Sequence, residues 1–154
     1  MQEGAPATAV LSRFIGEWEM VISIQGRPMS RGRTTFEWVE GRQFVVQHAD
    51  AAATNEAPPG WAEASPFPVT AIIGLDDTSG ALAMLYADGR SVFRIYQARL
   101  EGDEWTLWRD APGFFQRFIG SFGAGNRTIV GRWEASENGE DWNVDFELTY
   151  TRVD

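Results

Sequence analysis

The sequence contains no cysteine and no lysine, and its only histidine is His48. Without cysteine, the chain has no disulfide, no thiolate nucleophile and no cysteine-based metal site. Without lysine, Schiff-base chemistry is excluded. A single imidazole cannot form a multi-histidine metal site, so we expect no metal ligands. The sequence does not identify a cofactor.

Long apolar runs and recognisable catalytic motifs are also missing. No run approaches the roughly 20 apolar residues that span a bilayer, and the N-terminus lacks the pattern of a secretory signal, so we expect a cytoplasmic protein. The net charge of −9 opposes binding to nucleic acid or to an anionic membrane. No P-loop, G-x-S-x-G or dinucleotide fingerprint is present, and we assign no catalytic residue.

The residues that are present indicate one β-rich domain over residues 1–154. Hydrophobic residues make up 44% of the chain, with seven Trp and ten Phe, which is enough for a substantial core. From Trp18 to Ile24, apolar side chains occupy every second position, as in a strand with one buried face. Similar patterns predict about ten strands, at residues 18–24, 33–39, 42–49, 69–75, 81–87, 90–100, 104–109, 114–122, 126–135 and 141–153.

The connections between these strands are mostly short, and Asp88-Gly89 is typical of a two-residue hairpin turn. We therefore predict an all-β fold, an up-and-down antiparallel barrel preceded by a short helix in the first dozen residues. Residues 50–68 are rich in Ala and Pro and are long for a connection in a compact domain. They form either a lid over the barrel mouth or a loop packed on the outside.

Two segments near the termini carry a more specific signal. Gly16-Glu17-Trp18, at the start of the first predicted strand, resembles the G-x-W signature of calycins, which include lipocalins and fatty-acid-binding proteins. Together with Gly41-Arg42 and Ile73-Gly74-Leu75-Asp76, it is also similar to uncharacterised bacterial lipocalin-like families. The resemblance implies a lipocalin-like barrel in which Arg152, on the last strand, packs over Trp18 and closes one end. The alternative is that Trp18 is an ordinary core residue near a turn.

Nitrobindin-like barrels, a haem-binding branch, begin in a similar way and use a His near the C-terminal end as iron ligand. This chain departs from that pattern, because its C-terminal half contains no His. Haem binding of that type would require His48, on a different strand, to take over.

Candidate ligand contacts are polar side chains that alternate with aromatic ones on the predicted strands. Arg94 and Tyr96 share one face of their strand, and Arg117 lies on the strand that begins at Phe114. By analogy with barrels that bind carboxylate-bearing lipids, these three would hold an anion, because a buried anion needs cationic and hydroxyl partners. The alternative is that they point outward to water.

His48 and the tryptophans are further candidates. Alternation through Phe44 and Val46 predicts that His48 lies on the apolar face of its strand. Trp38 could line a cavity, as could Trp105, Trp108 and Trp133, or the four could fill the core solidly.

Three hypotheses about function follow. The leading one is noncatalytic binding of a small hydrophobic or amphipathic molecule inside the barrel, with His48, Arg94, Tyr96, Arg117 and Trp38 as contacts. The second is an isomerase or hydrolase that uses His48 as base, which requires His48 to face the cavity. The third is a homodimeric interaction module that associates through Trp61 and Phe67.

Overall fold

The structure is a computed structural model and describes residues 7–39, 44–51 and 66–153. A short helix, α1 (Ala7–Leu11), and a 3-10 turn, η1 (Ser12–Phe14), lead into the first strand, and a second 3-10 turn, η3 (Ala124–Asn126), precedes the ninth. The strands are β1 (Gly16–Ile24), β2 (Arg27–Trp38), β3 (Val45–Ala51), β4 (Val69–Leu75), β5 (Leu82–Asp88), β6 (Phe93–Glu101), β7 (Glu104–Arg109), β8 (Phe115–Phe122), β9 (Thr128–Ser136) and β10 (Asn143–Arg152).

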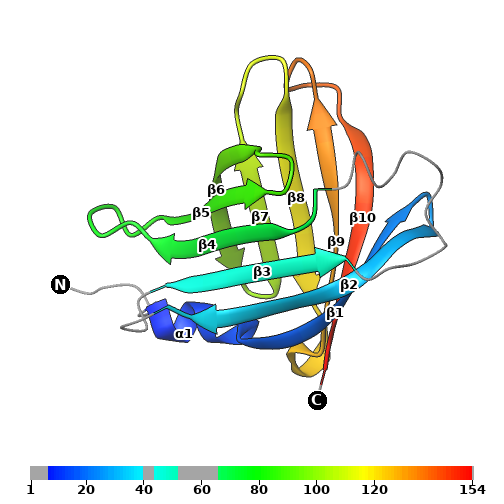
Figure 1. Ribbon diagram of the computed structural model, residues 1–154. Coiled ribbons are helices and arrows are strands. Elements are labelled where there is room, and N and C mark those ends of the chain that lie inside the picture. Colours follow the sequence, from blue (N-terminus) through cyan, green and yellow to red (C-terminus); the bar gives the residue numbers. More distant parts are fainter. Residues whose placement is uncertain (1–6, 40–43, 52–65, 154) are drawn as a thin grey trace.

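Within the described residues, ten strands form one closed antiparallel barrel (Figure 1). Each strand pairs with its neighbours in sequence, and β1 pairs with β10 to close the sheet. This arrangement confirms the predicted all-β barrel with its short N-terminal helix. Closure satisfies the backbone hydrogen bonds that open sheet edges would leave exposed. No helix in the described part of the chain is long and apolar enough to cross a membrane.

One end of the barrel is sealed by aromatic packing beneath the N-terminal helical segment. Phe14, at the end of η1, is fully buried. Its ring lies 5.2 Å from that of Phe36, 4.8 Å from that of Trp105 and 5.3 Å from that of Phe122, measured between centroids. Tilted and edge-on contacts of this kind stabilise a core beyond the area they bury. Because this end is filled, any internal space must lie toward the opposite end.

Two local predictions were wrong. On β3, the buried side chains are Val45, Gln47 and Ala49, so His48 lies on the outer face with Val46. Apolar residues occupy both faces at the start of this strand, so the alternation did not determine which face is buried.

The second wrong prediction concerns the length of the connection between β5 and β6. This connection spans residues 89–92, rather than the two residues Asp88 and Gly89. The carboxylate of Asp88 organises it by accepting hydrogen bonds from the backbone N–H groups of Arg90 and Val92. Asp residues commonly stabilise loops through such side-chain bonds, and here the bonds extend the loop beyond a tight turn.

Candidate ligand-binding site

The barrel is hollow. A cavity of about 300 Å³ lies inside it, at the lower end of the usual volume range for ligand pockets. Its wall is mainly apolar and draws on strands from all around the barrel, including Met20, Met84, Leu107, Phe118, Trp133 and Leu148.

A pair of glycines helps to keep this space open. Gly120 on β8 and Gly131 on β9 lie opposite each other, and the ring of Phe118 rests against both. A Cβ atom at Gly120 would lie 2.7 Å from Phe118 Cε2, and one at Gly131 would lie 2.6 Å from Phe118 Cζ. Both distances are shorter than van der Waals contact. The two glycines therefore allow the ring to lie close to the wall rather than project into the cavity.

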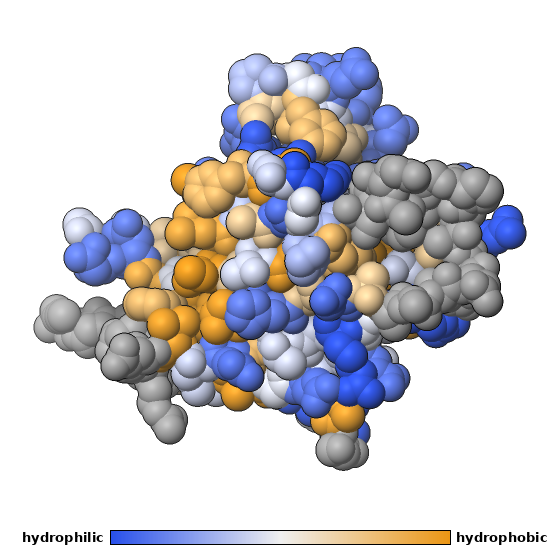
Figure 2. Space-filling view, in the orientation of Figure 1, coloured by the Kyte–Doolittle hydropathy of each residue, from blue (hydrophilic) through white to orange (hydrophobic). Residues whose placement is uncertain are grey.

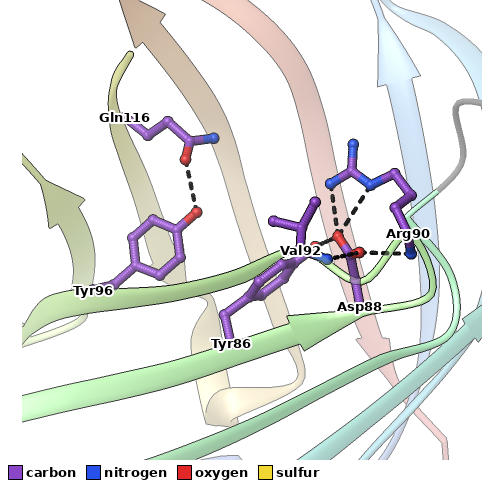
Figure 3. Close-up of polar contacts among 6 residues, drawn as sticks. All are labelled: Tyr86, Asp88, Arg90, Val92, Tyr96 and Gln116. Carbon is purple, nitrogen blue, oxygen red and sulfur yellow. Dashed lines mark hydrogen bonds and ion pairs between the residues drawn. The ribbon is translucent and has the colours of Figure 1, made fainter. Parts of the chain in front are cut away.

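One side of the cavity wall is polar. The Tyr96 hydroxyl, from β6, donates a hydrogen bond of 2.8 Å to Gln116 Oε1, from β8 (Figure 3). Both residues are buried, with Tyr96 only 2% exposed. Burial raises the pKa of Tyr96, while the neighbouring guanidinium of Arg94 opposes the rise. Tyr96 is therefore a neutral hydrogen-bonding group at ordinary pH.

Two arginines lie beside this pair. Arg94 lines the cavity, and its guanidinium lies 5.1 Å from the ring centroid of Phe114. Arg109, on β7, stands opposite Gln116 in the β7–β8 pairing, and its positive charge also acts to lower the pKa of Tyr96. Among the described residues, no carboxylate forms an ion pair with Arg94 or Arg109. Asp145 also lines the cavity, but it forms no ion pair with either arginine, so this side of the barrel carries two guanidinium groups without a direct carboxylate partner among the described residues.

Arg90, which also lines the cavity, is compensated. Its Nε and Nη2 donate to Asp88 Oδ2 at 3.1 and 2.6 Å, and the Tyr86 hydroxyl donates to the same oxygen at 2.7 Å (Figure 3). Burial opposes ionisation of Asp88, but these hydrogen bonds and those from the loop backbone hold its pKa below the usual value. Burial and the adjacent carboxylate raise the pKa of Tyr86. This cluster is ion-paired and fixes the β5–β6 loop at the cavity wall.

A third polar pair lies on another part of the wall. The Gln47 amide on β3 donates a 3.3 Å hydrogen bond to the hydroxyl of Tyr150 on β10. Burial raises the pKa of Tyr150 to about 12. The cavity therefore offers neutral amide and hydroxyl groups as well as cations.

The structure separates the residues proposed to hold an anion. Arg94 and Tyr96 lie together in the cavity wall. Arg117 does not line the cavity, because its neighbour Gln116 is the inward-facing residue on β8. Instead, Arg117 Nε donates to Glu134, and its guanidinium lies 3.9 Å from the centroid of Trp142.

The other proposed contacts also lie elsewhere. His48 is exposed on the outer face of β3, so it does not meet the requirement set for a catalytic base facing the cavity. Trp38 packs against the core without lining the cavity, and Trp108 lies under the guanidinium of Arg99. Trp105 and Trp133 do line the cavity.

The segment predicted to form a lid or an outer loop, residues 50–68, lies largely outside the described residues. Residues 52–65, which include Trp61, are not among them. Phe67 is described. It packs against the core and lines the cavity, rather than standing free on the surface. No group of His, Asp and Glu side chains in the described part of the chain is arranged to hold a metal ion.

Several lining residues were missed from the sequence. Tyr86 could have been found, since it follows Leu82 and Met84 at alternate positions of its strand. Gln116 shares a face with Phe118, but Phe115 and Ile119 made the opposite face equally plausible. Arg109 does not line the cavity, and its position opposite Gln116 becomes apparent only once the strand register is known.

Trp18 and Arg152 meet at the sealed end of the barrel. The Arg152 guanidinium lies 4.1 Å from the Trp18 ring centroid and donates to three backbone carbonyls, those of Arg13, Ile15 and Asn126. Trp18 Nε1 donates to the carbonyl of Phe14 at 2.9 Å. These contacts tie the first and last strands to η1 and η3.

Comparisons with known proteins support the fold. No protein-family model matches the chain, and no curated protein matches it. Among solved structures, the chain is similar to the crystal structure of Rv2717c from M. tuberculosis, with a TM-score of 0.59 and 14% sequence identity. The match covers 99% of this chain and 100% of that chain. At this identity the likeness shows a shared barrel fold and carries no activity with it.

Proposed function

We propose that this chain is a calycin-like protein that binds a small amphipathic molecule with an anionic group inside its barrel. The observation that carries the proposal is an apolar cavity of about 300 Å³ with Arg94 in its wall and no carboxylate among the described residues paired with Arg94. Arg94 is half-buried, and a cation partly withdrawn from water is stabilised by an anionic partner. A bound carboxylate would be that partner. The calycin-like assignment is supported by the contact between Trp18 and Arg152.

The volume limits the size of the ligand. A liquid water molecule occupies about 30 Å³, so the cavity corresponds to roughly ten waters. That space suits a ligand of roughly ten to fifteen non-hydrogen atoms. A medium-chain carboxylate such as decanoate has this size, whereas a haem or a long-chain phospholipid is far larger.

The distribution of side chains gives the ligand a direction. Arg94 and the Tyr96–Gln116 pair would hold the anionic group, with Arg109 adding a positive field behind them. The apolar tail would lie toward Phe118 and Trp105, near the sealed end. Charge-assisted hydrogen bonds would give the head group its specificity, and burial of the tail would supply most of the affinity.

Calorimetric titration with decanoate and with decanol tests the proposal, since the two share a tail and differ in charge. We expect both to bind at one site, with decanoate bound more tightly. Native mass spectrometry of the purified protein provides a second test, in which a retained acidic molecule of similar size is the expected result. Failure of decanoate to bind, or equal affinity for the two probes, would contradict an anion-binding cavity.

A further inference from the structure

The outer wall formed by strands β3 to β6 exposes an unusual number of large apolar side chains. Phe93 is 64% exposed, Ile95 57%, Leu85 42%, and Ile72 and Phe44 each 38%. We call the surface that these five residues define the β3–β6 face. Figure 2 shows hydrophobic colour gathered over this part of the molecule, while hydrophilic colour covers much of the remaining view.

The strand register makes these side chains contiguous. Val46, Ile72, Leu85 and Ile95 are direct partners across β3, β4, β5 and β6, so they form one outward row. In the next row, His48 pairs with Thr70, Thr70 with Ala87, and Ala87 with Phe93. Phe44 packs against Gly74 beside the first row, at the other side from Phe93. The exposed residues therefore form a continuous patch rather than scattered single positions.

The composition of the face indicates the kind of partner that it fits. Neither of the two rows contains an Asp, Glu or Arg on these four strands, although the chain as a whole has a net charge of −9. Without charge, the face cannot select a charged partner, and the negative charge elsewhere opposes an anionic membrane. The side chains between the large ones are small, including Thr70, Gly74 and Ala87, which suits close packing of one sheet face on another.

The exposed area of the face comes close to the lower limit for a specific dimer. At about 200 Å² for a Phe side chain, the exposed parts of Phe93 and Phe44 contribute on the order of 200 Å². Ile95, Leu85 and Ile72 add roughly 150 Å². Two such faces, together with the smaller residues between them, approach the total of about 1,000 Å² that marks a specific interface.

We propose that the protein forms a symmetric homodimer through the β3–β6 face. A second copy supplies the same apolar sheet surface, and a two-fold axis through the face would place the row from Val46 to Ile95 against the equivalent row of the other copy. Because the face lies on the barrel wall, dimerisation would leave the cavity unobstructed. This proposal does not depend on the ligand, and ligand binding can fail without affecting it.

Sedimentation velocity on the full chain across a range of protein concentrations tests the dimer. We expect the wild-type protein to be dimeric at high concentration, and the dimer to strengthen as salt screens the repulsion between two chains of charge −9. Ile95→Arg should make the protein monomeric at every concentration. Phe93→Arg, at the most exposed position of the face, serves as a second variant should Ile95→Arg fold poorly.

Val130→Arg is the matched control. Val130 is 56% exposed on β9, outside the β3–β6 face, so the same substitution there should leave the dimer intact. Thermal unfolding checks that the variants are folded. A wild-type protein that is monomeric at the highest concentration would overturn the proposal. So would a dimer that persists in folded Ile95→Arg or Phe93→Arg, or one that Val130→Arg disrupts equally.

Discussion

Replacing Arg94 with methionine removes the cationic group that lines the cavity without an acidic partner among the described residues. Methionine keeps an unbranched apolar chain, so packing near the ring of Phe114 changes little. The matched control is Arg117→Met, which removes the same charge from the outer face of β8, where Arg117 donates to Glu134. Both variants make the net charge more negative by the same amount. A difference in their affinity for decanoate therefore reflects the position of the arginine that was removed.

The expected magnitude follows from the strength of a charged hydrogen bond. Such bonds contribute about 1.5–3 kcal/mol, and each 1.4 kcal/mol changes affinity about tenfold. Arg94→Met should therefore weaken decanoate binding by roughly 10- to 100-fold. The positive charge of Arg109 remains beside Tyr96 and would keep the loss toward the lower value. Decanol affinity should change far less, because its head group carries no charge.

Calorimetric titration of the wild type and both variants with decanoate and decanol measures these differences. We expect a selective loss of decanoate affinity in Arg94→Met and no change in Arg117→Met. Equal decanoate affinity in the wild type and Arg94→Met would refute the role given to Arg94. An equal loss for both probes would mean that the substitution disturbed the shape of the cavity rather than its charge.

Three further predictions concern the cavity, the sealed end and the β5–β6 loop. Gly120→Ala should push the Phe118 ring toward the cavity and weaken decanoate and decanol alike, as measured by calorimetry; unchanged affinity would argue against the glycine pair as a spacer. Arg152→Met loses three hydrogen bonds to carbonyls and should lower the free energy of unfolding in urea by about 2–4 kcal/mol, whereas a change below about 0.5 kcal/mol would contradict a closing role. Asp88 has a pKa below its usual value of 3.8, so its contribution to stability is present above that pH and is lost as the pH falls through the folded-state value. Asp88→Asn should therefore be less stable than the wild type in urea at neutral pH, with a gap that narrows in acid; a gap independent of pH would be inconsistent with the ion pair to Arg90.

Sequence patterns predicted the fold well where only one face of a strand is apolar. The strong alternation of β1 gave its buried face. On β6, Arg94 and Tyr96 share one face, as predicted, but the apolar Phe93 and Ile95 on the opposite face point outward, so alternation alone did not show which face lines the cavity. The short connections between strands then predicted a closed antiparallel barrel, because closure is the simplest way to remove sheet edges.

The same reasoning failed where both faces of a strand are apolar. Phe44 and Val46 lie on the outside of the barrel, and their hydrophobicity led to the wrong face for His48. On β8, Phe115 and Ile119 left open whether the face of Gln116 or that of Arg117 points inward. When the outer surface of a strand is also apolar, the contrast between polar and apolar positions is lost. The sequence then does not show which alternate side chains face the interior of the barrel.

Other features depend on contacts between distant parts of the chain. The bond from Tyr96 to Gln116 joins β6 to β8 across β7, so it requires the register of three strands. The open space beside Phe118 depends on Gly120 and Gly131 being opposite each other. Neither relation is visible in local sequence, so the sequence alone left open whether the barrel is hollow or filled.

A crystal structure with decanoate carrying a terminal bromine would test the central claim most directly, because anomalous scattering locates the bromine and so gives the orientation of the tail. The account predicts one molecule inside the barrel, with its carboxylate within hydrogen-bond distance of Arg94 and its bromine near Phe118 and Trp105. A ligand bound only to the outer surface, or one inside with its carboxylate away from Arg94, would contradict it.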